Sequence, residues 1–176
     1  MIFTQGLVQV YTGNGKGKTT AAFGLALRAI GGGGKVAIVQ FMKGRGDYGE
    51  LAAIKQLAPA CLLENYGAAG WVHKDGPKDE HIAEAQKALA RAREVVQSGN
   101  WDLVILDEVI NAVWFGLLPE AELFALLDRK PQHVEVVLTG RNASQHLKAR
   151  ADLVTEMVQV KHPFEQGIAA RKGIEF

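Results

Sequence analysis

One short stretch, residues 11–20, constrains what this chain can fold into more than any other part of the sequence. It reads Tyr-Thr-Gly-Asn-Gly-Lys-Gly-Lys-Thr-Thr and lies between an alternating apolar run at residues 7–11 and a helical pattern at residues 21–27. A strand, a glycine-rich turn ending in Gly-Lys-Thr and a helix form a phosphate-binding loop. The N–H groups of such a turn point at an anion, and the helix N-terminus adds the positive end of its dipole. The sequence therefore predicts an α/β protein that binds a phosphorylated ligand.

The loop departs from the usual pattern at one position. That pattern has a glycine five positions before Gly17, where this chain has Thr12, and glycines stand at positions 13 and 15 instead. A flexible turn that binds nothing is the alternative, but Gly-Lys-Thr-Thr between a strand and a helix argues against it. We expect the nucleotide-binding residues to be Thr12, Gly13, Asn14, Gly15, Lys16, Gly17, Lys18, Thr19, Thr20 and Arg141.

Within the loop, Lys18 is predicted to place its charge beside the phosphates, and Thr19 to offer its hydroxyl to Mg²⁺. A charge pair at 4 Å is worth about 1 kcal/mol in water but about 4 kcal/mol at an effective dielectric near 20. For a lysine fixed in a partly closed loop, the lower dielectric and the larger energy apply. For Lys16 the sequence leaves two interpretations open, a second phosphate contact or a solvated loop lysine.

Composition and charge exclude several classes of protein. The 176 residues fit one domain, residues 1–176, with 48% hydrophobic and 22% charged residues. A formal net charge of +1 argues against a protein that wraps nucleic acid. No run approaches the roughly 18 apolar residues of a membrane span, and the first strand leaves no room for a signal peptide. Cys61 is the single cysteine, which excludes an internal disulfide, so we expect a buried thiol and a cytoplasmic protein.

Strand-like runs alternate with helical patterns along the rest of the chain. The predicted strands cover residues 36–41, 61–66, 101–106, 134–138 and 153–160, and the predicted helices cover residues 48–57, 82–96, 109–115 and 119–129. This alternation predicts an open, mostly parallel sheet with helices on both faces, the architecture of RecA-like P-loop NTPases. Ligands of such sheets bind beyond the carboxyl ends of the strands. That edge should bring together residues 12–20, the loop after Phe41, Asp107 with Glu108, and residues 139–141.

Two acidic residues, Asp107 and Glu108, directly follow the apolar run at residues 103–106. A carboxylate at that point can hold Mg²⁺, directly or through water, opposite the hydroxyl of Thr19. We therefore predict Thr19, Asp107 and Glu108 as metal-binding residues. Glu108 is either a metal ligand or a base that orients water, and the sequence does not say which carboxylate contacts the ion.

Other polar and aromatic residues near the predicted edge have two interpretations each. Arg141 either binds phosphate through its planar guanidinium or forms a salt bridge, and Lys43 and Arg45 either contact an anion or are solvated. Trp71 stands in a glycine-rich loop, where it either anchors the loop or stacks on a flat ligand. The five histidines show no metal-ligand spacing.

Several motifs in order resemble the P-loop ATP:corrinoid adenosyltransferases of cobalamin biosynthesis and salvage, from about residue 8 to residue 176. The resemblance rests on residues 11–24, 39–44 (Val-Gln-Phe-Met-Lys-Gly), 106–108 (Leu-Asp-Glu), 138–141 (Leu-Thr-Gly-Arg) and 160–164 (Val-Lys-His-Pro-Phe). Threonine in place of the first loop glycine is a trait of this family.

The resemblance implies a reaction in which the 5′-deoxyadenosyl group of ATP moves to cobalt(I) of a reduced corrinoid and triphosphate leaves. Lys18, the loop amides and Mg²⁺ (or Mn²⁺) would then stabilise the leaving group, because its charge grows as the C–O bond breaks. Asn14 would face the nucleoside, and Thr19 with Glu108 would hold the metal. The catalytic residues implied are Lys18, Glu108 and Trp71.

Trp71 resembles an aromatic residue that lies under the corrinoid in this family and displaces the lower ligand of cobalt(II). The position of a second such aromatic holds Ala69, and only residues 1–7 precede the first strand, where some members have a segment that covers the corrinoid. Family analogy further implies a homodimer and a reduced flavodoxin-type electron donor. From charge and hydropathy we expect no nucleic-acid or membrane partner. The natural acceptor is left open among cob(I)yrinic acid a,c-diamide, cobinamide and cobalamin.

Two other functions share part of this sequence support. A P-loop kinase or ATPase acting on the γ-phosphate would use the same lysine, threonine and acidic strand end, but it does not explain Thr12 or the loop around Trp71. A nucleotide-gated binding module, such as part of a RecA-like DNA motor, is disfavoured by the near-neutral charge and by the lack of a basic strip with aromatic residues.

Overall fold

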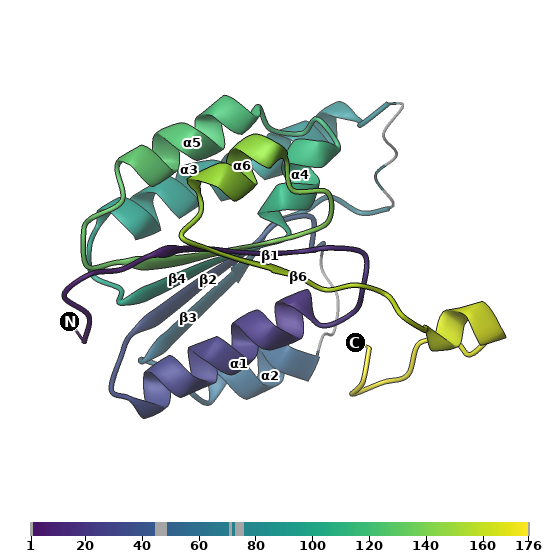
Figure 1. Cartoon of the computed structure of the whole chain (residues 1–176), viewed down its shortest axis with the longest axis horizontal. Coiled ribbons are helices and arrows are strands. Elements are labelled where there is room, and N and C mark those ends of the chain that lie inside the picture. The colour runs from purple at the N-terminus through teal and green to yellow at the C-terminus, as the bar shows by residue number, and fades with distance from the viewer. Residues whose placement is uncertain (1, 45–48, 71, 73–75, 176) are drawn as a thin grey trace.

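A six-stranded sheet forms the centre of the molecule, with strand order β3-β2-β4-β5-β1-β6 (Figure 1). The computed structural model describes residues 2–44, 49–70, 72 and 76–175. All neighbouring strands pair in parallel, which confirms the predicted fold class. The strands are β1 (Val8–Thr12), β2 (Val36–Gln40), β3 (Cys61–Asn65), β4 (Leu103–Asp107), β5 (Glu135–Thr139) and β6 (Leu153–Glu156).

Helices cover both faces of this sheet, as the alternating sequence pattern predicted (Figure 1). One face carries α1 (Lys18–Gly31) and α2 (Gly49–Lys55). The other face carries α3 (Asp79–Gln97), α4 (Val109–Trp114), α5 (Glu120–Asp128) and α6 (Gln145–Arg150). A short 3₁₀ helix, η1 (Pro163–Gln166), lies beyond β6.

Alternate residues of each central strand face the two helical layers. In β4, Val104 and Leu106 join the hydrophobic cluster that includes Leu89 of α3, whereas Leu103 and Ile105 join the cluster beneath α1. Burial on both faces requires an almost continuous apolar strand, which is why β4 reads as an unbroken hydrophobic run. The two layers hold the carboxyl ends of the strands at one edge.

Helix α6, strand β6 and the 3₁₀ helix η1 differ from the sequence prediction. Helix α6 was not predicted, because its six residues bury only one apolar side chain, Leu147, whereas the equally short α4 buries three. Its start is fixed by Ser144, whose Oγ accepts the N–H of Leu147 at 2.9 Å. Strand β6 ends at Glu156 and not at residue 160, because the chain then leaves the sheet and crosses the glycine-rich loop.

Cys61 is buried in β3, as predicted, and burial raises the pKa of its thiol to about 11. In the part of the chain described above, none of the helices combines the length and the apolar character needed to cross a membrane.

Candidate active site at the carboxyl edge of the sheet

A cavity of about 730 Å³ lies at the carboxyl edge of the sheet, where ligands of open α/β folds bind. Its walls come from the loop and first turn at residues 14–20, Lys43 after β2, Glu108 after β4 and Arg141 after β5. The topology therefore brings together the sequence segments that were predicted to meet. Its further lining residues are Phe23, Gly49, Glu50, His162, Gly173, Ile174 and Glu175.

Lys18 is the first residue of α1 and is only 8% exposed. Its Nζ donates to the carbonyl oxygens of Gly13 and Gly15, both at 2.7 Å. Burial lowers the pKa of Lys18, and the nearby charge of Arg141 lowers it further, against the opposing effect of Glu108 and Asp107. A largely desolvated ammonium held by carbonyl dipoles gains more from an anion than an exposed lysine does.

Asp107 is fully buried at the end of β4 and orients a hydroxyl of the loop. One carboxylate oxygen, Oδ1, accepts hydrogen bonds from Thr19 Oγ1 at 2.9 Å and from Thr139 Oγ1 at 2.7 Å. The other oxygen, Oδ2, accepts from Gln40 Nε2 at 2.9 Å. Both oxygens therefore have protein donors, and Asp107 lies behind Thr19 without lining the cavity.

Glu108, by contrast, lines the cavity, although it is the next residue in the chain. Its backbone has a φ of 62°, a left-handed conformation that costs a non-glycine residue about 1–2 kcal/mol. The Glu108 N–H donates to Thr139 Oγ1 at 2.9 Å, and the carboxylate accepts from Asn111 Nδ2. Burial raises the pKa of Glu108, with Asp107 as the second cause, while Lys43 is the largest of the opposing charges.

The donor set at this edge fits a magnesium ion. Across the described ranges, no group of three or more His, Cys, Asp or Glu side chains forms a complete metal site. Mg²⁺ does not need one, because it binds through one or two protein oxygens together with phosphate oxygens and water. The Thr19 hydroxyl donates a hydrogen bond to Asp107, which leaves its oxygen lone pairs available, and Glu108 lines the same cavity. These are the hard oxygen ligands that such an ion prefers.

Thr12, the unusual residue of the loop, has a structural contact. It ends β1 in an extended conformation, is 1% exposed and does not line the cavity. Its Oγ1 accepts the N–H of Ala143 at 3.2 Å, which connects β1 to the loop after β5. Glycine's freedom is not needed at a strand end, so a threonine can replace the usual first glycine of the loop.

The glycines at positions 13 and 15 accommodate the C-terminal strap, as we call residues 157–175. A Cβ atom on Gly13 would lie 2.4 Å from the carbonyl oxygen of Met157, and one on Gly15 would lie 2.8 Å from it. The Gly15 N–H donates to that same oxygen at 2.7 Å. In this conformation the Gly15 amide serves the strap and not an anion, a contact that the loop motif did not reveal.

Lys16 contacts the far end of the strap. The sequence had left open a phosphate contact or a solvated loop lysine, and this contact is neither. The Lys16 Nζ donates to the Ile174 carbonyl oxygen at 2.9 Å and to Glu175 Oε1 at 3.2 Å. Arg171 also binds Glu175, and these contacts lower the pKa of that carboxylate to about 2, with Arg171 as the largest cause. Figure 1 shows the yellow C-terminal segment turning back toward the start of α1.

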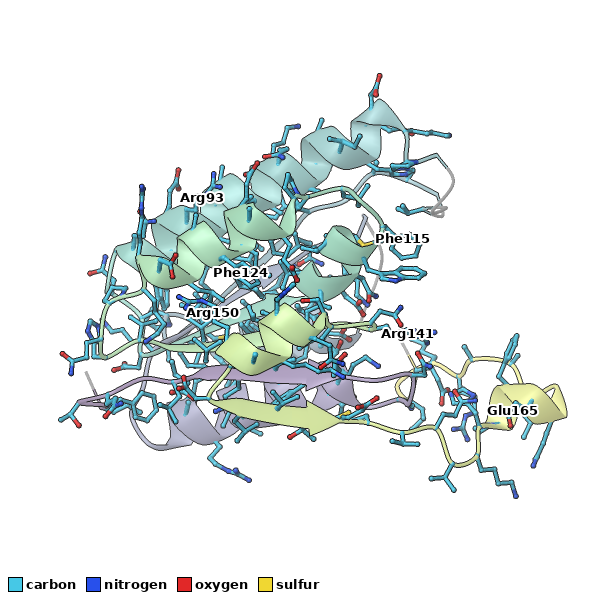
Figure 2. All side chains as sticks on the ribbon, turned by 45° about the horizontal axis from the view of Figure 1, so that its top comes forward. Arg93, Phe115, Phe124, Arg141, Arg150 and Glu165 are labelled. Atoms are coloured by element: carbon cyan, nitrogen blue, oxygen red, sulfur yellow. The ribbon has the colours of Figure 1, made fainter. Side chains whose placement is uncertain are left out.

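Arg141 lies at the same end of the sheet, on the side toward which the strap with Glu165 extends (Figure 2). Its backbone N–H donates to Asn111 Oδ1 at 2.6 Å. Among the described residues its guanidinium forms no ion pair, so the salt bridge that the sequence left open is not formed there. Arg45 and Trp71 lie outside the described residues, so their predicted roles stay predictions.

The contributors that had no predicted role in the site include Gln40, Asn111 and the strap. Gln40 had a usable signal, since it is a polar residue inside an otherwise apolar strand. Asn111 had none. Residues 160–164 of the strap had one only as part of the family resemblance, and the contact of Lys16 with the strap was not apparent because it joins segments that are far apart in the chain.

Known proteins resemble this chain over nearly its whole length. The family model for ATP:corrinoid adenosyltransferases (BtuR/CobO/CobP) matches residues 4–176. A corrinoid adenosyltransferase of a Sinorhizobium species is 42% identical over 175 residues, covering 98% of this chain and 81% of the relative. Corrinoid adenosyltransferases of Pseudomonas aeruginosa and Escherichia coli K12 are 39% and 36% identical, covering 98% of this chain and 84% and 86% of the relatives.

Proposed function

The chain belongs to the ATP:corrinoid adenosyltransferase family, and we propose that the cavity at the sheet edge is its ATP-binding site. The observation that carries this proposal is Lys18, a buried ammonium at the start of a helix whose contacts are carbonyl dipoles. Such a group, together with the helix dipole, is suited to a polyanion. ATP and the corrinoid are the two substrates of the family reaction.

In this reaction the cobalt(I) of the reduced corrinoid attacks C5′ of the ribose. A cobalt–carbon bond forms, the C5′–O bond breaks, and its electron pair stays on the triphosphate. Lys18 and the N–H groups at the start of α1 would stabilise that growing charge, so they act more strongly in the transition state than on bound ATP. Arg141 would bind the triphosphate from the wall after β5.

We further propose that Thr19 and Glu108 hold a divalent ion and that Asp107 fixes the Thr19 hydroxyl in place. When bound, Mg²⁺ or Mn²⁺ would neutralise charge on the triphosphate. Asn14 is proposed to face the nucleoside. Trp71 is proposed to lie under the corrinoid.

We also propose a homodimer formed through the C-terminal strap. The strap exposes large apolar side chains, among them Val160 at 93% and Phe164 at 77%. They continue from the exposed residues of β6, an edge strand, and exposed apolar surfaces of this kind favour a protein partner. A reduced flavodoxin-type protein is the proposed electron donor, and the cytoplasm, in keeping with the free thiol of Cys61, is the proposed compartment.

The experiment that tests the function identifies the products. Purified protein with Mg-ATP and a chemically reduced corrinoid should form a light-sensitive alkylcobalt product and release triphosphate. Lys18→Ala should reduce both by at least about a hundredfold, because it removes a preorganised charge, and should leave the fold intact. Release of ADP and phosphate would instead support a kinase or ATPase, and near-normal turnover of Lys18→Ala would remove Lys18 from its role. Competition among the three candidate corrinoids would identify the acceptor.

A further inference from the structure

The Val-Lys-His-Pro-Phe sequence at residues 160–164 places a histidine at the start of η1, where its ring has one nitrogen fixed by the backbone. His162 Nδ1 accepts the N–H of Phe164 at 3.2 Å. A ring nitrogen that accepts a hydrogen bond carries no proton. The neutral imidazole therefore carries its proton on Nε2, and that N–H is available as a donor.

His162 lines the same cavity as Lys18 and Arg141. The strap that carries it is held on both sides of His162. On one side, Met157 exchanges hydrogen bonds with the loop, donating to Thr12 at 2.8 Å and accepting from Gly15 at 2.7 Å. Beyond η1, the strap is held by Lys16. His162 is therefore positioned before any ligand enters.

The charges around the cavity favour an anionic ligand on this side. The strap's own carboxylate in the wall, Glu175, is already bound by Arg171 and Lys16. Lys16, Lys18, Lys43 and Arg141 line the same space, and they outnumber the two other carboxylates in its wall, Glu50 and Glu108. An imidazole N–H complements an ionised phosphate oxygen, because a charged acceptor strengthens the hydrogen bond.

We propose that His162 is a binding residue for the triphosphate of ATP, to which Nε2 donates a hydrogen bond. This inference rests on the proposed function, because it requires ATP in this cavity. Under this proposal the Val-Lys-His-Pro-Phe motif contributes a ligand-binding residue, and the strap forms one wall of the nucleotide site.

His162→Asn separates this role from a structural one. The Asn Oδ1 can accept the Phe164 N–H in place of Nδ1, since asparagine is a good N-cap, but asparagine does not reach as far as Nε2. We expect an unchanged melting temperature. Calorimetric titration without corrinoid should show binding of Mg-ATP and of inorganic triphosphate weakened roughly tenfold or more, as for a lost hydrogen bond to a charged group.

His162→Gln is the reciprocal variant, because its terminal amide reaches toward the position of Nε2 but replaces the cap poorly. It should retain more affinity for inorganic triphosphate than His162→Asn does, even if its melting temperature is lower. Equal affinities of wild type, His162→Asn and His162→Gln for triphosphate would overturn the proposal. A loss with ATP but not with triphosphate would also overturn it, by moving the contact to the nucleoside.

Lys18→Ala distinguishes failure of this inference from failure of the proposed function. If Lys18→Ala loses triphosphate binding while both His162 variants keep it, ATP occupies the cavity and only the role of His162 is wrong. If Lys18→Ala also binds triphosphate normally, the cavity is not the ATP site and both proposals fail.

Discussion

Asp107 and Glu108 are adjacent in the chain but have opposite surroundings, and the division of their tasks follows from that difference. Asp107 accepts hydrogen bonds from Thr19, Thr139 and Gln40 inside the protein. Glu108 takes a left-handed backbone conformation that directs it to the cavity wall. The sequence could identify the pair, because it follows an apolar strand, but not which carboxylate faces the ligand. That choice depends on one backbone angle and on donors from β2, α1 and β5.

Glu108→Gln tests the electrostatic environment of the site through the pH dependence of stability. The pKa of Glu108 is raised in the folded protein, so the folded state binds this proton more tightly than the unfolded state does. The associated stability is present below the unfolded pKa, about 4.3 for a glutamate, and is lost as the pH rises through the folded pKa. Glu108→Gln removes this loss of stability at high pH, because glutamine does not ionise.

The variant should therefore have a higher free energy of unfolding than the wild type at pH 8, and the difference should shrink toward pH 4. Urea denaturation without ligand at both pH values measures it. Adenosyl transfer by the same variant should fall by about a hundredfold, because the ion loses an anionic ligand. A variant less stable than wild type at pH 8 would show that the carboxylate is stabilised by its surroundings and would contradict the account.

At the scale of elements, a helix or strand could be predicted from the sequence when hydrophobic burial stabilises it, and not when a few specific contacts do. The buried strands β2 and β4 were predictable because hydrophobic burial on two faces shows directly as an apolar run. Helix α6 and the course of the strap were not, because a single cap at Ser144 and backbone contacts across more than 140 residues determine them. The loop motif predicts a phosphate site, but it did not reveal that its glycines also accommodate Met157.

Gly15→Ala tests the contact between loop and strap. Its new Cβ atom would lie 2.8 Å from a backbone oxygen that cannot move alone, so we expect a loss of about 1–3 kcal/mol in the free energy of unfolding. Gly24→Ala in α1 is the matched control, since nothing lies within 4 Å of its Cβ position, and it should gain about 0.5–1 kcal/mol. Equal stabilities of the two variants in chemical denaturation would mean that the strap does not pack on the loop.

At the scale of the whole molecule, the six-stranded parallel sheet places the loop, Glu108 and Arg141 at one edge. The strap lines one side of the cavity at that edge. The meeting of these residues at one edge was predictable from the sequence, because ligands of open parallel sheets bind beyond the carboxyl ends of the strands. The position of the strap beside the cavity was not predictable, because its sequence has neither the helical nor the strand periodicity of hydrophobic residues. Its exposed apolar side chains are what connect the single chain to the proposed homodimer.

Phe164→Asp tests that assembly. A charge in the middle of an apolar contact between two copies is costly, so the variant should be a monomer where the wild type is a dimer in size-exclusion chromatography with light scattering. Leu27→Asp is the control, because Leu27 is a single exposed apolar residue on α1 and its replacement should leave the mass unchanged. A dimeric Phe164→Asp protein would place the interface elsewhere.

The most direct measurement of the central claim is a crystal structure with Mg-ATP bound. We predict phosphate oxygens at the N–H groups that begin α1, within hydrogen-bonding distance of Lys18, with the ion between Thr19 and Glu108. We also predict that the ribose C5′ faces open space that can admit a corrinoid. A nucleotide bound elsewhere with this loop vacant, or a C5′ enclosed by protein on all sides, would contradict the account.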